Sequence, residues 1–422
     1  MKVAVVHEWL DCYAGSERVL EQLLEIWPGA DLFAVCDFVP AGERAFLRGK
    51  PVRTTFIQRL PFARRCFRMY LPLMPLAIEQ LDLSGYDLVV SSSHAVAKGV
   101  LTGPGQLHVS YIHSPMRYAW DLQHQYLRQS GMERGPKGAL TRLLLHGLRI
   151  WDRSSAAGVD VMVANSGYIA DRIRKAWRRE ALVVHPPVDV GGFPPNGAQR
   201  GDHYVVASRM VPYKRVDLVV EAFRAMPSRR LLVLGDGPEW KRVQAAAAGA
   251  PNIELRGRVP QAELVEAVRT ARAFVFAAEE DFGIAMVEAQ ACGTPVIAYG
   301  RGGARDIVRA PPDPEPTGLF FAEQSAEAIA AAVERFETLP RGISAADCRA
   351  NAQRFGRERF KNAMRRIVAD HMLDQPCDSP SSWRPAAAAA RSEPFSSRWP
   401  RKAAPMPKQS SSTRTGTTVS TR

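Results

Sequence analysis

The sequence predicts an α/β protein with two Rossmann-like domains that face each other across a cleft, and a C-terminal helix that crosses back to the N-terminal domain. Three observations predict this fold. Short apolar runs alternate with helical patterns along most of the chain, which is typical of parallel sheets covered by helices. The alternation stops once, at the Pro- and Gly-rich segment Pro186–Gly201, and then starts again. The chain has 422 residues, of which 46% are hydrophobic, and this suits two domains better than one.

The first half carries the pattern of one such domain. Its helical stretches include Glu17–Ile26 and Gly138–Ala157. The candidate strands are the apolar runs Lys2–His7, Asp31–Cys36, Tyr86–Ser91, Leu107–Ile112, Val161–Ala164 and Leu182–His185.

The second half repeats the alternation and predicts another Rossmann-like sheet. Its candidate strands are Tyr204–Ser208, Leu231–Leu234, Ile253–Arg256, Ala273–Phe276 and Thr294–Ala298. Three helical segments follow, at Ala326–Glu337, Ala345–Gln353 and Arg357–His371.

We therefore divide the chain into four parts. The N-terminal domain occupies residues 1–190 and the C-terminal domain 200–355, followed by the crossover helix at 356–374. The last part, 375–422, is rich in Ala, Ser, Pro, Thr and Arg, which indicates a disordered basic tail.

Composition excludes several classes of protein. The six cysteines are scattered, with no Cys-x-x-Cys pair, so neither a disulfide framework nor a zinc site is indicated. The chain shows no signal peptide and no unbroken run of about 18 apolar residues. We expect a protein of a reducing compartment, the cytoplasm.

The formal net charge is +13, of which +6 falls in the tail. The remaining excess suits an anionic small ligand or an anionic membrane surface. No stripe of interleaved arginines and aromatics supports nucleic acid as a partner.

The densest chemical pattern follows the strand that ends at Phe276. Seven residues separate Glu280 from Glu288, and Gly283 stands where the loop becomes a helix. Glycine lets backbone N–H groups approach a ligand, and a helix N-terminus carries partial positive charge that suits a diphosphate. Glu280 could hold sugar hydroxyls and Glu288 a ribose. Alternatively, these acidic residues only favour the helix dipole.

A second pattern, two basic residues, follows the strand predicted at Tyr204–Ser208. Arg209 and Lys214 are fixed cations at the carboxyl end of that strand. They could neutralise a departing nucleoside diphosphate, a task otherwise given to a divalent metal. The alternative is that they only solvate a helix start. No Asp-x-Asp motif competes for the role, so we expect neither a metal nor another cofactor.

Together these motifs resemble family 4 of the retaining glycosyltransferases, which have the GT-B fold. The resemblance covers roughly residues 1–370. Its motifs occur in the family's order and comprise Arg209 with Lys214, Gly235–Pro238, Arg256–Val259 and Glu280–Gly300.

The resemblance implies a role for eleven residues. It assigns Arg209 and Lys214 to the donor diphosphate and Glu280 to the transferred sugar, and it places His113 beside the anomeric carbon, where it helps stabilise a cationic transition state. A lone histidine is more often structural, but the position of His113 at a strand end favours function. Donor binding is assigned to Gly15 in a glycine-rich loop, to Arg258 and Val259 near the base, to Phe282, Gly283 and Ile284 near the sugar, and to Glu288 at the ribose.

The glycine-rich loop departs from the family's pattern in one place. The family often has two glycines there, but this chain has Ala14 before Gly15. How closely the backbone approaches phosphate at that point is therefore left open.

Three further segments resemble bacterial mannosyltransferases that build O-antigen and exopolysaccharide repeat units. They are Ser91–Gly99, Tyr111–Asp121 around His113, and Glu280–Ile284. This implies GDP-mannose as the nucleotide-sugar donor and a polyprenyl-diphosphate-linked oligosaccharide as the acceptor. With no carboxylate placed as a nucleophile, we favour a front-face mechanism in which the departing diphosphate takes the acceptor proton.

The stretch from Arg53 to Leu83 interleaves four arginines with aromatic and aliphatic residues. Such a segment could lie on an anionic bilayer, so that the protein would contact the inner face of the plasma membrane. It could equally be a core helix with a basic outer face.

Four other functions remain as alternatives. A glycosyltransferase that uses UDP-glucose or UDP-N-acetylglucosamine would carry the same motifs, and a nucleotide-sugar epimerase could share the fold. A nicotinamide-dependent oxidoreductase is disfavoured because no G-x-G-x-x-G follows the first strand. A non-catalytic scaffold is disfavoured by the full set of donor-site residues.

Overall fold

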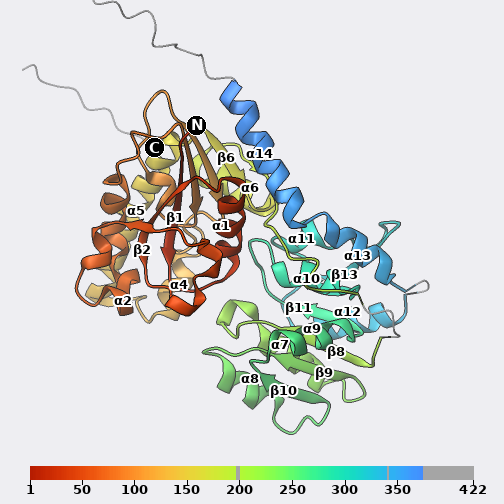
Figure 1. The fold of residues 1–422 in the computed structure, drawn as a ribbon. Coiled ribbons are helices and arrows are strands. Elements are labelled where there is room, and N and C mark those ends of the chain that lie inside the picture. The colour runs from red at the N-terminus through yellow and green to blue at the C-terminus, as the bar shows by residue number, and fades with distance from the viewer. Residues whose placement is uncertain (196–199, 340–341, 374–422) are drawn as a thin grey trace, which may run out of the picture. The chain divides into compact units, whose positions relative to one another are not determined.

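Two parallel β-sheets organise the protein in the computed structural model, which describes residues 1–195, 200–339 and 342–373 (Figure 1). Both sheets belong to one compact unit that ends at Gln375. The tail predicted at 375–422 lies outside the described residues.

The N-terminal sheet has seven parallel strands in the order β3-β2-β1-β4-β5-β6-β7. The strand order reverses between β1 and β4, the switch point at which open α/β sheets bind ligands. In chain order the strands are β1 (Val3–Leu10), β2 (Asp31–Asp37), β3 (Val52–Thr54), β4 (Leu88–Ser93), β5 (Leu107–Ile112), β6 (Val161–Ala164) and β7 (Leu182–Val183).

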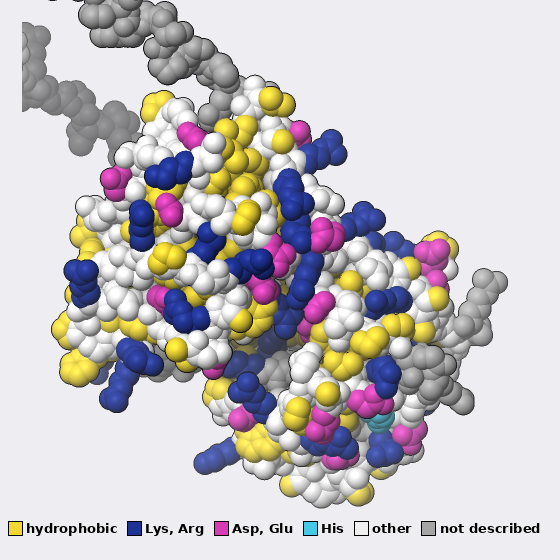
Figure 2. Space-filling view, viewed as in Figure 1, with side chains coloured by type: hydrophobic (Ala, Val, Ile, Leu, Met, Phe, Trp, Pro, Cys, Tyr) yellow, Lys and Arg dark blue, Asp and Glu magenta, His cyan; other side chains and the backbone are white. Residues whose placement is uncertain are grey.

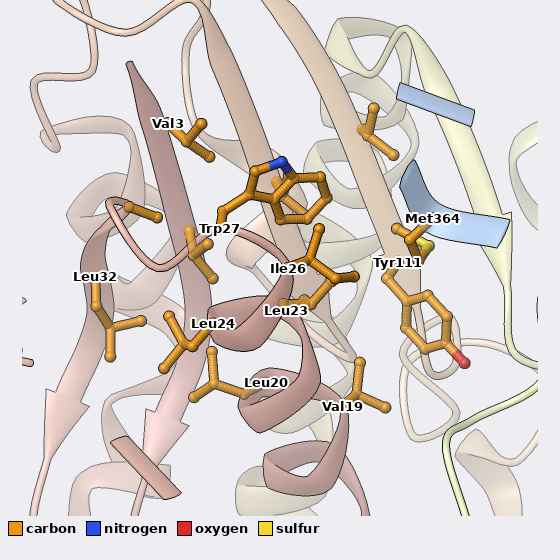
Figure 3. Packing of buried hydrophobic residues seen from close by; sticks show 14 of the residues in the cluster. Val3, Val19, Leu20, Leu23, Leu24, Ile26, Trp27, Leu32, Tyr111 and Met364 are labelled. Atoms are coloured by element: carbon orange, nitrogen blue, oxygen red, sulfur yellow. The ribbon is translucent and has the colours of Figure 1, made fainter. Parts of the chain in front are cut away.

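Alternate residues of each strand pack into different cores on the two faces of this sheet. Val3 and Val5 of β1 face a core that includes one side of α1 (Gly15–Ile26), as Figure 3 shows for Leu20, Leu23 and Leu24. Ala4 and Val6 of the same strand face the other core. Burial on both faces explains why these strands read as continuous apolar runs.

The other helices of the N-terminal domain lie in the connections between strands. They are α2 (Ala63–Cys66), α3 (Met74–Glu79), α4 (Gln123–Gln129), α5 (Gly135–Ser155) and α6 (Gly167–Trp177).

The C-terminal sheet has six parallel strands in the order β10-β9-β8-β11-β12-β13. They are β8 (His203–Ala207), β9 (Arg230–Leu234), β10 (Ile253–Gly257), β11 (Ala273–Phe276), β12 (Val296–Tyr299) and β13 (Gly318–Phe321). The helices are α7 (Val216–Arg224), α8 (Trp240–Ala247), α9 (Gln261–Arg269), α10 (Ile284–Ala291), α11 (Ala304–Ile307), α12 (Ala326–Glu337) and α13 (Ala345–Gln353).

The last described helix, α14 (Arg357–Leu373), returns to the N-terminal domain (Figure 1). Its buried residues Phe360, Met364 and Ile367 belong to the same core as α1 and β1, and Figure 3 shows Met364 close to Tyr111 of β5. The predicted fold class, including this crossover, is confirmed.

The segment Arg53–Leu83 is not a single helix, so the alternative of one core helix is wrong. It contains β3, the 3₁₀ helices Phe56–Arg59 and Phe67–Leu73, and the short helices α2 and α3. Proline breaks the helical hydrogen-bonding pattern, and Pro61, Pro72 and Pro75 interrupt this segment.

Candidate functional site

The carboxyl ends of the central strands surround a pocket of about 770 Å³ that both domains line. The N-terminal domain contributes Gly15, the first residue of α1, and His113 from the loop after β5. The C-terminal domain contributes Arg209 and Lys214 from the loop after β8, and Glu280 from the loop after β11. Residues far apart in the sequence therefore meet at one site.

A second pocket of about 730 Å³ adjoins the first, because both are lined by Ala207, Ser208, Ala285 and Glu288. Arg258 and Val259 line this second pocket. The two pockets together hold all the sequence-predicted site residues, namely His113, Arg209, Lys214, Glu280, Gly15, Arg258, Val259, Phe282, Gly283, Ile284 and Glu288.

Helix α10 begins at the wall of the first pocket, and Gly283 makes this start possible. Gly283 has φ of 104°, which L-residues rarely adopt, and a Cβ there would lie 2.4 Å from the Met286 methyl carbon. The first N–H groups of a helix have no partner within it and can bind an anion. The Gly283 turn thus aims backbone donors at the pocket.

Lys214 and Arg209 differ in their surroundings. The Lys214 ammonium forms an ion pair with Glu280 and is 15% exposed. Burial, and then the Arg117 guanidinium, lowers the pKa of Lys214 to about 8, while the Asp281 carboxylate opposes this shift. Arg209 is exposed and forms no ion pair with any carboxylate in the described part of the chain. The Arg209 guanidinium can therefore bind an anionic ligand in the pocket that it lines.

Two contacts join the first turn of α1 to α10. The Arg18 guanidinium donates to Glu288 at 2.6 Å. A Cβ on Gly15 would lie 3.7 Å from the Ile284 side chain. The glycine-rich loop therefore faces the start of α10, and Arg18 holds the carboxylate that the resemblance assigns to a ribose.

The glycine-rich loop is fixed by Glu17. Its carboxylate accepts from the backbone N–H of Ala14 at 2.9 Å and lies 3.2 Å from His7 Nε2. Burial raises the pKa of Glu17, but the hydrogen bond with His7, the charge of His7 and the hydrogen bonds from the backbone and Ser16 together outweigh this and lower the pKa to about 2. The loop is thus held by an ionised, buried carboxylate.

His113 is neutral at physiological pH. Burial, and then the nearby His94 and His7, lowers the pKa of His113 to about 3. Its Nε2 lies 2.9 Å from the Ser92 hydroxyl, and the Asn165 amide donates to its carbonyl at 3.0 Å. These contacts orient an uncharged imidazole toward the pocket that it lines.

The loop that carries His94 is anchored by Glu8, which is fully buried in β1. This carboxylate accepts hydrogen bonds from the Ser93 hydroxyl and from the backbone N–H groups of His94, Ala95, Val96 and Ala97. One acidic side chain therefore shapes the loop after β4.

Sequence reasoning missed the contacts of Arg18, Asp281, Arg117 and Arg172. Asp281 forms ion pairs with Arg117 at 3.4 Å and with Arg172 at 3.5 Å. Two sequence positions pointed weakly to these contacts, since Asp281 follows Glu280 directly and Arg18 lies one turn after Gly15.

The described residues contain no group of three or more His, Cys, Asp or Glu side chains arranged to hold a metal ion. Independence from metals stays a prediction. Among the same residues, no helix combines the length and the apolar character needed to cross a bilayer.

Two protein families match the chain, one for each domain. Residues 13–191 match the family described as Glycosyltransferase Family 4, and residues 196–355 match Glycosyl transferases group 1. The chain belongs to glycosyltransferase family 4. Its two sheets are the two domains of the GT-B fold.

Two curated relatives of this family 4 member match parts of it. The D-inositol 3-phosphate glycosyltransferase of Segniliparus rotundus is 34% identical over 34% of the chain and 38% of its own length. The GDP-mannose-dependent alpha-(1-6)-phosphatidylinositol monomannoside mannosyltransferase of Mycolicibacterium smegmatis is 32% identical over 35% of the chain and 46% of its own length. The chain thus spans less than half of the length of either relative.

A solved structure shares the fold over most of this family 4 chain. Anabaena HepE, crystallised in complex with UDP, aligns with 88% of the chain and 100% of its own, with a TM-score of 0.65 and 16% sequence identity. The likeness extends across both domains.

Proposed function

We propose that this protein transfers a glycosyl group from a nucleoside diphosphate sugar to a hydroxyl group of an acceptor. The observation that carries the proposal is the convergence of Arg209, Lys214 and the start of α10 on one pocket. These cations and backbone donors suit the charge that develops on a leaving diphosphate. Because they already supply positive charge, we propose a reaction that needs no metal or other cofactor.

The two adjoining pockets would hold different parts of a nucleoside diphosphate sugar. The diphosphate and sugar would occupy the first pocket, against Lys214 and Glu280, and the base the second, against Arg258 and Val259. Glu288 lines both, which suits a ribose between diphosphate and base. In this arrangement the ribose hydroxyls replace Arg18 as the partners of Glu288.

The reaction forms a bond between the acceptor oxygen and the anomeric carbon and breaks the bond from that carbon to the diphosphate. We propose retention of configuration, with the departing diphosphate taking the acceptor proton. Positive charge develops on the sugar in such a transition state. A neutral His113 suits this position, because a protonated imidazole would repel the developing charge.

The donor that we favour is GDP-mannose. The motifs around His113 and Glu280 support it, as does the name of the Mycolicibacterium relative, which is GDP-mannose-dependent. UDP-glucose and UDP-N-acetylglucosamine are the alternative donors, and HepE was crystallised with UDP.

The acceptor that we propose is a lipid-linked saccharide of surface polysaccharide synthesis, reached at the cytoplasmic face of an anionic membrane. A surface that we call the α2–α5 patch supports this proposal. Phe62 and Met69 are 79% and 78% exposed, beside the exposed arginines Arg59, Arg64 and Arg65. Figure 2 shows hydrophobic and Lys/Arg side chains next to each other over α2.

Helix α5 supplies the second part of the α2–α5 patch. Leu140, Leu143 and Ile150 are each more than half exposed and recur at the spacing of one helix face. The Trp151 indole on this helix donates to Glu79 of α3 at 2.6 Å, which places α5 next to the α2–α3 segment. Apolar side chains among arginines suit an anionic bilayer.

The test is a donor panel of GDP-mannose, UDP-glucose and UDP-N-acetylglucosamine, assayed for hydrolysis with and without lipid-linked acceptor. We expect nucleoside diphosphate release from GDP-mannose and transfer when acceptor is present. Preference for a UDP-sugar would change the donor but not the reaction class. An epimerised sugar formed without acceptor would overturn the proposal.

A further inference from the structure

The carboxylate of Asp281 lies between two guanidinium groups of the N-terminal domain. Arg117, in the loop after β5, approaches one oxygen at 3.4 Å, and Arg172, on α6, approaches the other at 3.5 Å. The Asp281 side chain is 18% exposed. Such a carboxylate, with both oxygens paired, fixes the loop that carries it.

Neighbouring contacts attach the same loop to the same domain. The Ser166 hydroxyl donates to the Asp281 carbonyl, and the Tyr168 hydroxyl donates to Glu279 at 3.1 Å. Glu280 therefore has an anchored residue on each side. Its own carboxylate points to Lys214 across the pocket.

Asp281 also acts on Lys214 through its charge. The charged and titratable groups around the Lys214 ammonium are Glu280, Asp281, Arg117, Arg209 and Tyr213. Burial and Arg117 lower the pKa of Lys214, and Asp281 raises it. Loss of the Asp281 charge would therefore favour the neutral amine, which cannot neutralise a diphosphate.

We propose that Asp281 is a positioning residue of the donor site, which holds Glu280 in place through Arg117 and Arg172 and supplies a negative charge to the pocket that Lys214 lines. The proposal rests on the proposed function and adds Asp281, which lines the first pocket beside Glu280 and is already paired with two guanidinium groups. The Asp281 carboxylate then joins the N-terminal domain to the loop that carries Glu280, together with the contacts of Ser166 and Tyr168.

The test is the pH profile of kcat/KM for the donor in the full-length protein, measured for the wild type and Asp281→Asn. The profile of kcat/KM reports ionisations of the free enzyme. We expect the wild-type value to fall above about pH 8, where Lys214 loses its proton. In Asp281→Asn this alkaline limb should move down by about one pH unit, because an opposite charge nearby shifts a pKa by about that much or more.

Three further variants separate positioning from loss of structure. Asp281→Glu should restore the wild-type profile. Arg117→Gln removes a cation near Lys214 and should move the limb to higher pH, a direction that general damage cannot produce. Asp121, whose side chain is 51% exposed, is the other carboxylate partner of Arg172. Asp121→Asn removes that partner and should leave the pH profile unchanged.

The outcomes distinguish this inference from the proposed function. A wild-type protein that turns over none of the three donors would contradict the proposed function itself. If the wild type is active and the alkaline limb stays in place in either Asp281→Asn or Arg117→Gln, Asp281 has no such role. Arg117→Gln keeps the test decisive even if Asp281→Asn does not fold.

Discussion

At the scale of single residues, the two cations of the proposed donor site differ in their surroundings. Lys214 is largely buried and already paired with Glu280. A bound diphosphate would therefore share the Lys214 ammonium with the Glu280 carboxylate. Arg209 is exposed and lines the same pocket. We therefore assign to Arg209 the larger gain in interaction as the diphosphate departs.

The first prediction concerns Arg209→Ala. One electrostatic contact of this kind is worth about 3 kcal/mol in the barrier, so we expect kcat to fall about 100-fold. Arg224→Ala, on α7 outside both pockets, is the control and should keep wild-type turnover. Full turnover in Arg209→Ala would contradict the assignment.

The second prediction concerns the charge of His113. Because the pKa of His113 is about 3, its imidazole stays neutral as the pH falls from 7 to 5. Ionisation of His113 should therefore cause no loss of kcat/KM between pH 7 and 5. An acidic limb near pH 6.5 that disappears in His113→Asn would show that this histidine titrates normally.

The sequence predicted residues that line the two pockets, but not the contacts between them; their roles stay predictions. Glu280, Glu288 and Arg209 stand in motifs, so their residue types and spacing were sufficient. The contact between Arg18 and Glu288 joins residues 270 positions apart, and no local pattern encodes it. Such pairs depend on how the two sheets are brought together.

At the scale of elements, helix α10 depends on the backbone conformation of Gly283. An alanine there would combine φ of 104° with a Cβ 2.4 Å from the Met286 methyl carbon. The Met286 methyl group can move aside, but the positive φ strains the backbone at the residue from which α10 begins, next to the N–H groups that face the pocket.

The third prediction follows from this geometry. Gly283→Ala should weaken nucleoside diphosphate binding about 5- to 150-fold, since a backbone strain of about 1–3 kcal/mol acts at the binding element itself. Gly249→Ala is a matched control, because it also has positive φ but no atom within 4 Å of the added Cβ. Equal losses of affinity in the two variants would contradict the role of the α10 start.

The fourth prediction concerns the α2–α5 patch. We expect the protein to sediment with vesicles that contain phosphatidylglycerol and less with pure phosphatidylcholine, with the difference decreasing as salt rises. Replacing Phe62 and Met69 by serine should reduce binding. Leu182→Ser is the control, because this residue is 46% exposed on β7, at the opposite edge of the sheet from β3. Equal binding to both kinds of vesicle would contradict the proposed partner.

Unbroken apolar runs and long periodic helices were predicted most reliably. The strands at Leu107–Ile112 and Ala273–Phe276 and the helix at Ala326–Glu337 have the predicted bounds. The edge strands β3 and β13 were missed, because runs of three and four residues carry little periodic signal. Pairing with the neighbouring strand of the sheet, rather than the intrinsic β-propensity of these residues, makes the two segments strands.

At the scale of the whole molecule, folding keeps several histidines uncharged. Burial lowers the pKa of His108 and His185 to about 4 and that of His113 to about 3. The unfolded chain takes up these protons near pH 6.5, and the folded chain does not. The contribution of these uncharged histidines to the free energy of unfolding is therefore fully present above pH 6.5. It is lost as the pH falls toward 4.

The fifth prediction is this acid dependence. Each such histidine reduces the free energy of unfolding by up to about 1.4 kcal/mol per pH unit over that range. Urea unfolding at pH 7.5, 6.5, 5.5 and 4.5 measures it, and His108→Gln should show a shallower slope. A wild-type stability that does not change between pH 6.5 and 4.5 would contradict this account.

The central claim is that Arg209, Lys214 and the start of α10 bind the donor diphosphate without a metal ion. Calorimetric titration with GDP in excess EDTA, for the wild type and the double variant Arg209→Ala/Lys214→Ala, tests it most directly. We expect the wild type to bind with the same Kd in EDTA and in magnesium, and the double variant to bind at least about 100-fold more weakly. Wild-type binding that appears only with magnesium, or an unchanged Kd in the double variant, would contradict the claim.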